Sequence, residues 1–165
     1  MFKLHFFCIG NRIAGNEELL KSINQQGHII GNHSYSHHFW FDLFSPKKML
    51  SDMKLMDVIV NEYTGLTPKL FRPPYGVTNP NVKKAIINGE YIPIGWSIRS
   101  MDTVIKDEKK LLKKVTKNIK PGAIILFHET SKTTLNMLPE FIKYVKAKDY
   151  EIMRLDKMLN LQPYA

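Results

Sequence analysis

The sequence predicts an α/β fold in which parallel strands are covered by helices, and three features of the 165-residue chain support this. Short apolar runs alternate with longer segments whose apolar residues recur at helical spacing. Gly, Pro and Asn stand between these segments, where caps and turns need them. Chemically reactive side chains such as His33 directly follow several apolar runs. Because the carboxyl ends of parallel strands meet at one rim, the pattern predicts a single functional groove there, in an open sheet or a barrel.

The predicted elements follow from this alternation. The predicted strands span residues 2–9, 28–31, 69–71, 91–96, 123–127 and 151–153. The predicted helices span residues 16–27, 45–63, 79–89, 107–119 and 133–146, with a short helix closing the chain. Asn16 is expected to cap the first helix, which Gly27 ends, and Pro46 fits the first turn of the second, which Gly65 ends.

Length and composition indicate one globular domain over residues 1–165, with 44% hydrophobic and 24% charged residues. The single Cys8 excludes an internal disulfide and is expected to be buried. The apolar N-terminal run is too short for a signal peptide, and no segment reaches the roughly 18 apolar residues of a membrane span. The compartment therefore stays open, with a soluble cytoplasmic protein as the default.

The net charge of +9 raises the question of a nucleic-acid or polyanion partner. Many lysines lie in residues 106–120, interleaved with apolar residues at helical spacing. This pattern favours a solvated helix face, so we expect no nucleic-acid partner. Binding of an anionic polymer by the basic surface is the weakest of three functional hypotheses.

Two histidines four residues apart, His33 and His37, follow the predicted strand over residues 28–31. A histidine-rich turn can be a solvated loop or a set of capped core residues. The spacing also suits two imidazole ligands of one ion, zinc first and cobalt or nickel as alternatives. A catalytic site needs about three protein ligands, so the pair predicts a metal site that still requires a third.

Two further segments carry reactive side chains after predicted strands. Arg72 to Gly76 reads as a rigid Pro-Pro turn, but its arginine can also orient a carboxylate and its backbone N–H groups can stabilise an oxyanion. His128 ends an apolar strand and can be a satisfied core histidine. Its position at the predicted rim favours a general acid or base instead.

These segments together resemble the polysaccharide deacetylases, the NodB-type domains of carbohydrate esterase family four. The resemblance runs through residues 6–11, the Gly-His-x-x-Gly-Asn-His-Ser-Tyr-Ser-His run over 27–37, Arg-Pro-Pro-Tyr-Gly over 72–76 and Ile-Leu-Phe-His over 125–128. It implies an incomplete, distorted (β/α) barrel of parallel strands surrounded by helices. It also implies a divalent metal that serves the removal of acetyl groups from N-acetylated or O-acetylated sugars.

The resemblance assigns roles to individual residues. His33 and His37 would be metal ligands, Tyr75 would offer its backbone N–H to the oxyanion, and Arg72 would orient the base. His128 would be the general acid, and Asp102 would keep one of the acids of the family's Asp-x-x-Asp-Trp motif. The residues expected to contact the substrate are Pro74, Trp96 and Leu126.

Three departures from the family pattern qualify these roles. The first motif, Thr-Phe-Asp-Asp-Gly, supplies the base and the third ligand and is expected on a strand before Phe2, where this chain has none. Glu17 and Glu18 lie in a predicted helix and are not natural replacements. Arg99 stands where an acid is expected to tune the catalytic histidine, and Glu129 replaces an aspartate.

The leading hypothesis is a domain derived from a metal-dependent deacetylase of acetylated glycans: a chitin-like oligomer, peptidoglycan or acetylated xylan. The alternative is a catalytically impaired pseudoenzyme that binds carbohydrate without turnover. A missing first strand also predicts an unpaired sheet edge and self-association through it.

Overall fold

The computed structural model describes residues 2–165, and the elements group into two compact units. Unit 1 comprises Met1–Ile94 and Met153–Ala165, and unit 2 comprises Gly95–Ile152. Each unit contains parallel strands and helices, as the sequence predicts. The single domain over residues 1–165 stays a prediction, and so does the single groove at one rim.

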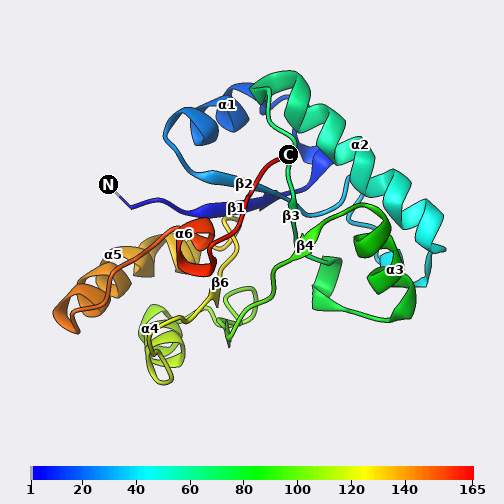
Figure 1. Ribbon diagram of the computed structural model, residues 1–165. Coiled ribbons are helices and arrows are strands. Elements are labelled where there is room, and N and C mark those ends of the chain that lie inside the picture. Colours follow the sequence, from blue (N-terminus) through cyan, green and yellow to red (C-terminus); the bar gives the residue numbers. More distant parts are fainter. Residues whose placement is uncertain (1) are drawn as a thin grey trace. The chain divides into compact units, whose positions relative to one another are not determined.

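Unit 1 is built on a four-stranded parallel sheet in the order β1 (His5–Cys8), β2 (Ile29–Asn32), β3 (Leu70–Phe71) and β4 (Ile92–Pro93) (Figure 1). The register pairs Phe7 with Gly31 and Asn32 with Phe71. The candidate residues of this unit therefore follow the carboxyl ends of neighbouring strands. Among the described residues β1 is an edge strand, and self-association through that edge stays a prediction.

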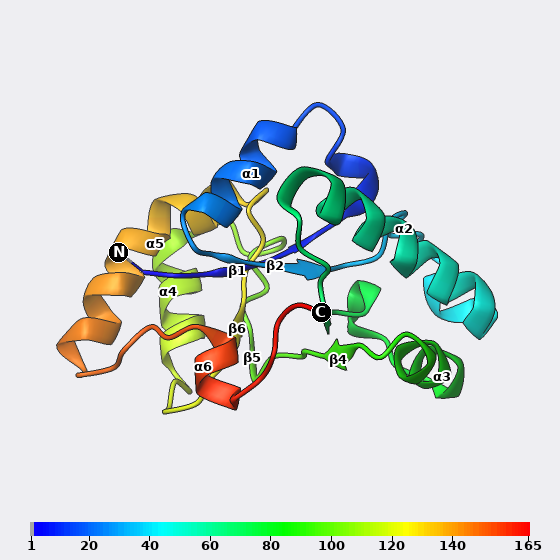
Figure 2. The same ribbon diagram turned by 45° about the horizontal axis from the view of Figure 1, so that its top comes forward.

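The helices of unit 1 are α1 (Glu17–Gln25), α2 (Pro46–Thr64), α3 (Pro80–Asn88) and α6 (Leu155–Leu159). Short 3-10 turns lie at η1 (Gly10–Arg12), η2 (Phe41–Leu43) and η3 (Pro74–Gly76). Helices α1 and α2 lie on the same side of β1 and β2 in both views (Figures 1 and 2). There Met56 and Val60 of α2 pack with Ile30 of β2, which fixes the helix against the strand that His33 and His37 follow.

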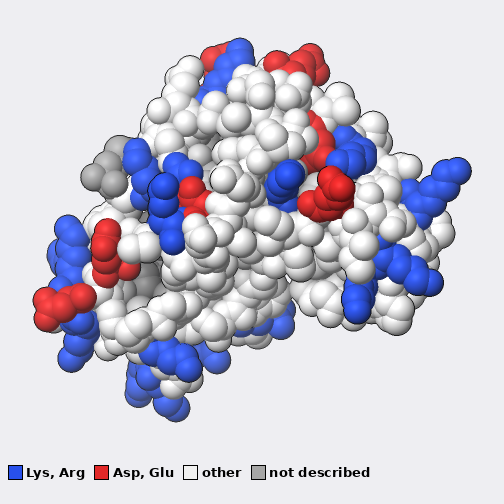
Figure 3. All heavy atoms as spheres, in the orientation of Figure 1, with Lys and Arg blue, Asp and Glu red and all other residues white. Residues whose placement is uncertain are grey.

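Unit 2 contains the parallel pair β5 (Ile98–Arg99) and β6 (Ile125–Leu126) with α4 (Glu108–Thr116) and α5 (Lys132–Ala147). Apolar residues of α4 and α5, including Leu111, Val115 and Phe141, form its core. The lysine-rich face of α4 is exposed, as the helical spacing predicts. Figure 3 shows basic side chains in separate groups on the face it displays, with acidic side chains among them.

Several details differ from the sequence predictions. Most strands are shorter than predicted, because ladder pairing ends after two to four residues, whereas β2 keeps the predicted four residues. Residues 151–153 form no strand, and Ile152 instead packs into the apolar core of unit 2. Asn16 precedes α1 but makes no capping bond, since its side chain donates to the Arg12 carbonyl instead. Cys8 is half-buried and not fully buried. Within residues 2–165, no helix is long and apolar enough to cross a membrane.

Candidate active site

His33 and His37 lie together at the carboxyl end of β2, with ring centroids 4.7 Å apart. The His33 backbone N–H donates to the Cys8 carbonyl at 3.0 Å, which continues the β1–β2 pairing. His33 Nδ1 lies 2.6 Å from the Arg72 carbonyl oxygen. A carbonyl oxygen only accepts, so Nδ1 carries the proton and the lone pair of the neutral ring is on Nε2. This is the tautomer that a hydrogen bond of this kind fixes in metal-ligating histidines.

The turn between the two histidines is held by its own side chains. Ser34 and His37 both have left-handed backbone conformations, with φ of 67° and 46°. Ser34 Oγ accepts the His37 backbone N–H at 2.9 Å, and the Asn32 side chain accepts the Ser34 N–H at 2.8 Å. These bonds offset the cost of two non-glycine residues at positive φ, which is of order 1–3 kcal/mol each. The turn is thus held in a strained conformation that brings the imidazoles together.

A buried polar network anchors this turn to α2. The Asn32 amide donates to Asp57 Oδ1 and to the Met53 carbonyl, both at 2.8 Å. The Tyr91 hydroxyl donates to Asp57 Oδ2 at 2.5 Å, and burial together with this bond raises the pKa of Tyr91 far above its ordinary value. Asp52, five residues earlier on α2, accepts the backbone N–H of Tyr35 at 2.8 Å. Two carboxylates of α2 therefore fix the conformation of the histidine turn.

Arg72 follows β3, is 8% exposed, and lies across the carboxyl ends of the sheet strands. Its Nε donates to the Ile94 carbonyl at 3.1 Å, and its guanidinium lies 4.0 Å from the centre of the Phe7 ring. Phe7 in turn lies against Gly31, where an added Cβ would be only 2.6 Å from the ring. Burial lowers the pKa of Arg72 to about 10, so the guanidinium stays charged at neutral pH.

The Pro73–Pro74 turn that follows Arg72 is rigid and strained. Tyr75 has φ 56° and ψ 1°, a left-handed conformation that costs free energy in a non-glycine residue. The N–H of Gly76 donates to the Pro73 carbonyl at 3.0 Å and closes the turn. Pro74 is buried, while the Tyr75 ring is exposed and lies 4.8 Å from the His37 ring. Unit 1 thus brings together His33, His37, Arg72, Pro74 and Tyr75.

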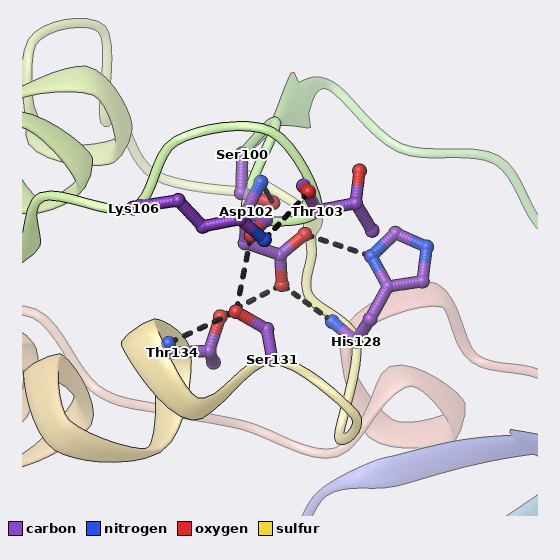
Figure 4. A network of polar contacts seen from close by, with 7 residues as sticks. All are labelled: Ser100, Asp102, Thr103, Lys106, His128, Ser131 and Thr134. Atoms are coloured by element: carbon purple, nitrogen blue, oxygen red, sulfur yellow. Dashed lines mark hydrogen bonds and ion pairs between the residues drawn. The ribbon is translucent and has the colours of Figure 1, made fainter.

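In unit 2, His128 is held by Asp102 through two hydrogen bonds (Figure 4). The imidazole Nδ1 donates to Asp102 Oδ1 at 2.8 Å, and the His128 backbone N–H donates to Oδ2 at 2.7 Å. Asp102 is fully buried, while the His128 side chain is 43% exposed. The pair is a histidine oriented by a buried carboxylate, with its Nε2 edge accessible for proton transfer.

Asp102 is itself fixed by the start of α5. The Thr134 hydroxyl donates to Asp102 Oδ2 at 2.7 Å, and the Ser131 hydroxyl donates to the Asp102 carbonyl at 3.1 Å (Figure 4). Burial alone would raise the pKa of Asp102, but the hydrogen bonds from His128 and Thr134 outweigh it and lower that pKa. The carboxylate therefore stays ionised at neutral pH and can stabilise a protonated His128.

The other predicted residues of unit 2 lie near the β5–β6 pair. Leu126 pairs with Arg99 in the ladder and is half-buried, as is Trp96. Arg99 is exposed on β5. Asp102, the acid that the sequence retains, supplies the carboxylate that orients His128, and the effect of Arg99 on that histidine stays a prediction. Contact of Trp96 and Leu126 with a substrate stays a prediction.

The donor set fits a divalent metal in part. His33 and His37 are borderline ligands that suit zinc, cobalt or nickel, and the Nδ1 bond of His33 has the form that metal sites use. Across residues 2–165, no group of three His, Cys, Asp or Glu side chains is placed to hold one ion. The described residues thus offer two ligands of a catalytic site that needs about three.

Sequence reasoning missed the residues that support the site, above all Asn32, Asp57, Tyr91 and Thr134. One signal was present for Asp57, which is four residues after Met53 on the buried stripe of α2. A carboxylate on such a stripe requires a buried partner. The partners themselves come from β2 and from the segment that leads into β4, so the sequence order does not identify them.

Comparison with known proteins decides the family. The family model described as polysaccharide deacetylase matches residues 1–91. The chain belongs to the polysaccharide deacetylase family. The peptidoglycan-N-acetylglucosamine deacetylase PgdA of Listeria monocytogenes serotype 1/2a is 30% identical over 157 residues. That match covers 94% of this chain but 33% of the relative, so the chain spans about a third of that protein.

Solved deacetylase structures have the same fold. The Bc1960 peptidoglycan N-acetylglucosamine deacetylase superposes with a TM-score of 0.93 at 25% identity, covering 99% of this chain and 78% of that one. A family-four pseudoenzyme from Bacillus anthracis matches with a TM-score of 0.87 at 25% identity, covering 95% of this chain and 56% of that one. The predicted fold class, α/β of the polysaccharide deacetylase type, is confirmed. The family contains proteins described as enzymes and others described as pseudoenzymes.

Proposed function

We propose that this chain carries the catalytic elements of a metal-dependent hydrolase that removes acetyl groups from N-acetylated sugars of peptidoglycan. The observation that carries the proposal is the His33 ring, bonded through Nδ1 to the Arg72 carbonyl and lying beside His37. The names of the relatives support peptidoglycan over a chitin-like oligomer or acetylated xylan. Hydrolysis of O-acetyl groups is the alternative chemistry at the same site.

His33 and His37 would hold the divalent ion, zinc first, with cobalt or nickel as alternatives. Such an ion, when bound, supplies a polarised acetyl carbonyl and a more acidic water. The chain's own residues do the rest. Arg72 presents a fixed positive charge that orients a catalytic carboxylate. The strained turn at Tyr75 presents its backbone N–H to the developing oxyanion.

His128 acts as the general acid in this proposal. Its Nδ1 donates to Asp102, so its Nε2 delivers a proton to the leaving amine of the sugar. The ionised Asp102 stabilises the protonated imidazole and prevents the ring from rotating. The Thr134 hydroxyl and the His128 backbone N–H keep that carboxylate in place.

The test uses an extended chain in which a strand bearing Thr-Phe-Asp-Asp-Gly precedes residue 1. With zinc or cobalt added, we expect release of acetate from peptidoglycan fragments, with slower release from chitin oligomers and acetylated xylan. His128→Ala should lower the rate by about 10² to 10⁴-fold, the range for a positioned acid. Thr103→Ala, next to Asp102 but outside the proposed roles, is the matched control. Full activity of the His128 variant would remove the histidine from the mechanism.

A carbohydrate-binding pseudoenzyme is the second candidate, and one observation favours it. Within residues 2–165 no third side chain completes a metal site with His33 and His37. The Bacillus anthracis relative is itself described as a pseudoenzyme of the same esterase family. If the extended chain binds glycan fragments but releases no acetate with zinc, cobalt or nickel, the pseudoenzyme is the correct function.

Metal binding by residues 1–165 tests the ligand assignment without turnover. Two histidines without a third ligand should bind zinc weakly, and His33→Ala should abolish that binding in a calorimetric titration. His38→Ala removes a neighbouring histidine of the same run and should leave the affinity unchanged. Tight zinc binding that survives His33→Ala would refute the two-histidine site.

A further inference from the structure

Three exposed aromatic side chains gather beside the histidine turn of unit 1. Phe39 and Trp40 follow the turn and are 62% and 55% exposed, while Tyr75 of the strained turn after β3 is 50% exposed. The Phe39 ring meets the Trp40 ring edge to face at 4.6 Å and the Tyr75 ring at 5.6 Å. Residues from two separate segments thus form one aromatic platform: Phe39, Trp40 and Tyr75.

This platform is continuous with the proposed metal ligands. The Tyr75 ring lies 4.8 Å from the His37 ring, which lies 4.7 Å from the His33 ring. The same segments therefore carry both the exposed rings and the residues assigned to the chemistry. Ring contacts therefore run without a gap from the two histidines through Tyr75 to the Phe39–Trp40 pair.

Local structure holds the rings in their exposed positions. The Trp40 backbone N–H donates to His38 Nδ1 at 3.1 Å, and the Phe41 N–H donates to the His38 carbonyl at 3.0 Å. Phe41 itself is 2% exposed and anchors η2 in the core. A large apolar side chain kept in water next to an anchored one costs hydration free energy, and such clusters mark interaction sites.

We propose that Phe39 and Trp40, with the Tyr75 ring, form a stacking subsite for a pyranose ring of the glycan, next to the sugar that bears the reacting acetyl group. The inference rests on the proposed function for the identity of its ligand. The apolar face of a pyranose fits the flat face of an aromatic ring. An aromatic side chain has few rotamers, so ordering it on binding costs little conformational entropy. These rings would bind the glycan at a sugar other than the reacting one, and this contact would position the reacting sugar at the histidines.

The experiment measures binding of an N-acetylglucosamine tetramer to residues 1–165 by titration calorimetry, so no turnover is needed. Phe39→Ala and Trp40→Ala should each weaken binding about tenfold, the usual effect of removing an aromatic anchor. Trp40→Phe keeps a ring and should retain most of the affinity. Leu19→Ala removes an equally exposed apolar side chain, 60% exposed on α1, and should bind as the unaltered chain does.

The outcomes separate this inference from the proposed function. Unchanged affinity in both alanine variants, or no saturable binding by the unaltered chain, would overturn the stacking subsite. Weakened binding in these variants together with no acetate release by the extended chain would keep the subsite and reject the hydrolase. Acetate release by extended chains that lack either ring, at the unaltered KM, would keep the hydrolase and reject the subsite.

Discussion

Removing the hydroxyl of Thr134 tests whether Asp102 is held as an ionised partner of His128. Thr134 is 7% exposed, and its hydroxyl donates to Asp102 Oδ2 at 2.7 Å. Thr134→Val replaces the hydroxyl by a methyl group of similar size. A hydrogen bond to a charged group contributes about 1.5–3 kcal/mol. Because Oδ2 keeps the His128 backbone N–H at 2.7 Å, we expect a loss near the lower end, about 1.5–2 kcal/mol of unfolding free energy.

The unfolding free energy that Thr134→Val loses should depend on pH. The folded-state pKa of Asp102 is lowered from 3.8, so its ionisation contributes stability that is present above 3.8 and lost as the pH falls through the folded value. Thr134→Val raises that folded value, since it removes one of the donors that stabilise the carboxylate. The cost of the substitution should therefore be complete at pH 7 and become smaller below about pH 4.

Urea unfolding at pH 7 and near pH 3 measures both effects, with Thr134→Ser as the matched control. The serine keeps the hydroxyl and should retain most of the stability that the valine loses. An equal loss at the two pH values would show that packing, and not the charge of Asp102, sets the cost. If Thr134→Ser is as unstable as Thr134→Val, the hydrogen bond from the hydroxyl to Asp102 does not account for the loss of stability.

Two further substitutions test the packing and the acid sensitivity of unit 1. Gly31→Ala places a Cβ 2.6 Å from the Phe7 ring and should lower the free energy of unfolding in urea by about 1–3 kcal/mol. Gly95→Ala is the control, because no atom lies near the added Cβ, and it should cost little. Equal losses in the two variants would refute the close approach of Phe7 to Gly31. Burial lowers the pKa of His5 from 6.5 to about 4, and its Nε2 accepts the Leu155 N–H. Its neutral form therefore contributes stability that is complete above pH 6.5 and is lost as the pH falls towards 4, about 2–3 kcal/mol after allowance for partial exposure. His5→Gln should flatten the unfolding free energy over that range, and an unchanged slope would assign the acid sensitivity to another group.

The sequence alone identified the family and the α/β class, and it predicted which side chains follow the strands. Apolar runs and turn residues are local signals, so two helices begin near residues 45 and 79 as predicted, but the predicted cap Asn16 makes no capping bond. His33, His37, Arg72 and Tyr75 could be placed together because the carboxyl ends of parallel strands meet. The lengths of most strands are overestimated from the sequence, because a strand extends only as far as it pairs with a partner, and sequence order does not identify that partner.

Only the tertiary structure decided how these residues are held. The positive φ of Ser34, His37 and Tyr75 is imposed by hydrogen bonds and turn closure, which no propensity predicts for such residues. Asp102 is distant in sequence from His128 and Thr134, so only the fold shows that their side chains meet. Residue types and spacing reveal which groups can react, but the pairing of a buried carboxylate depends on which elements pack around it.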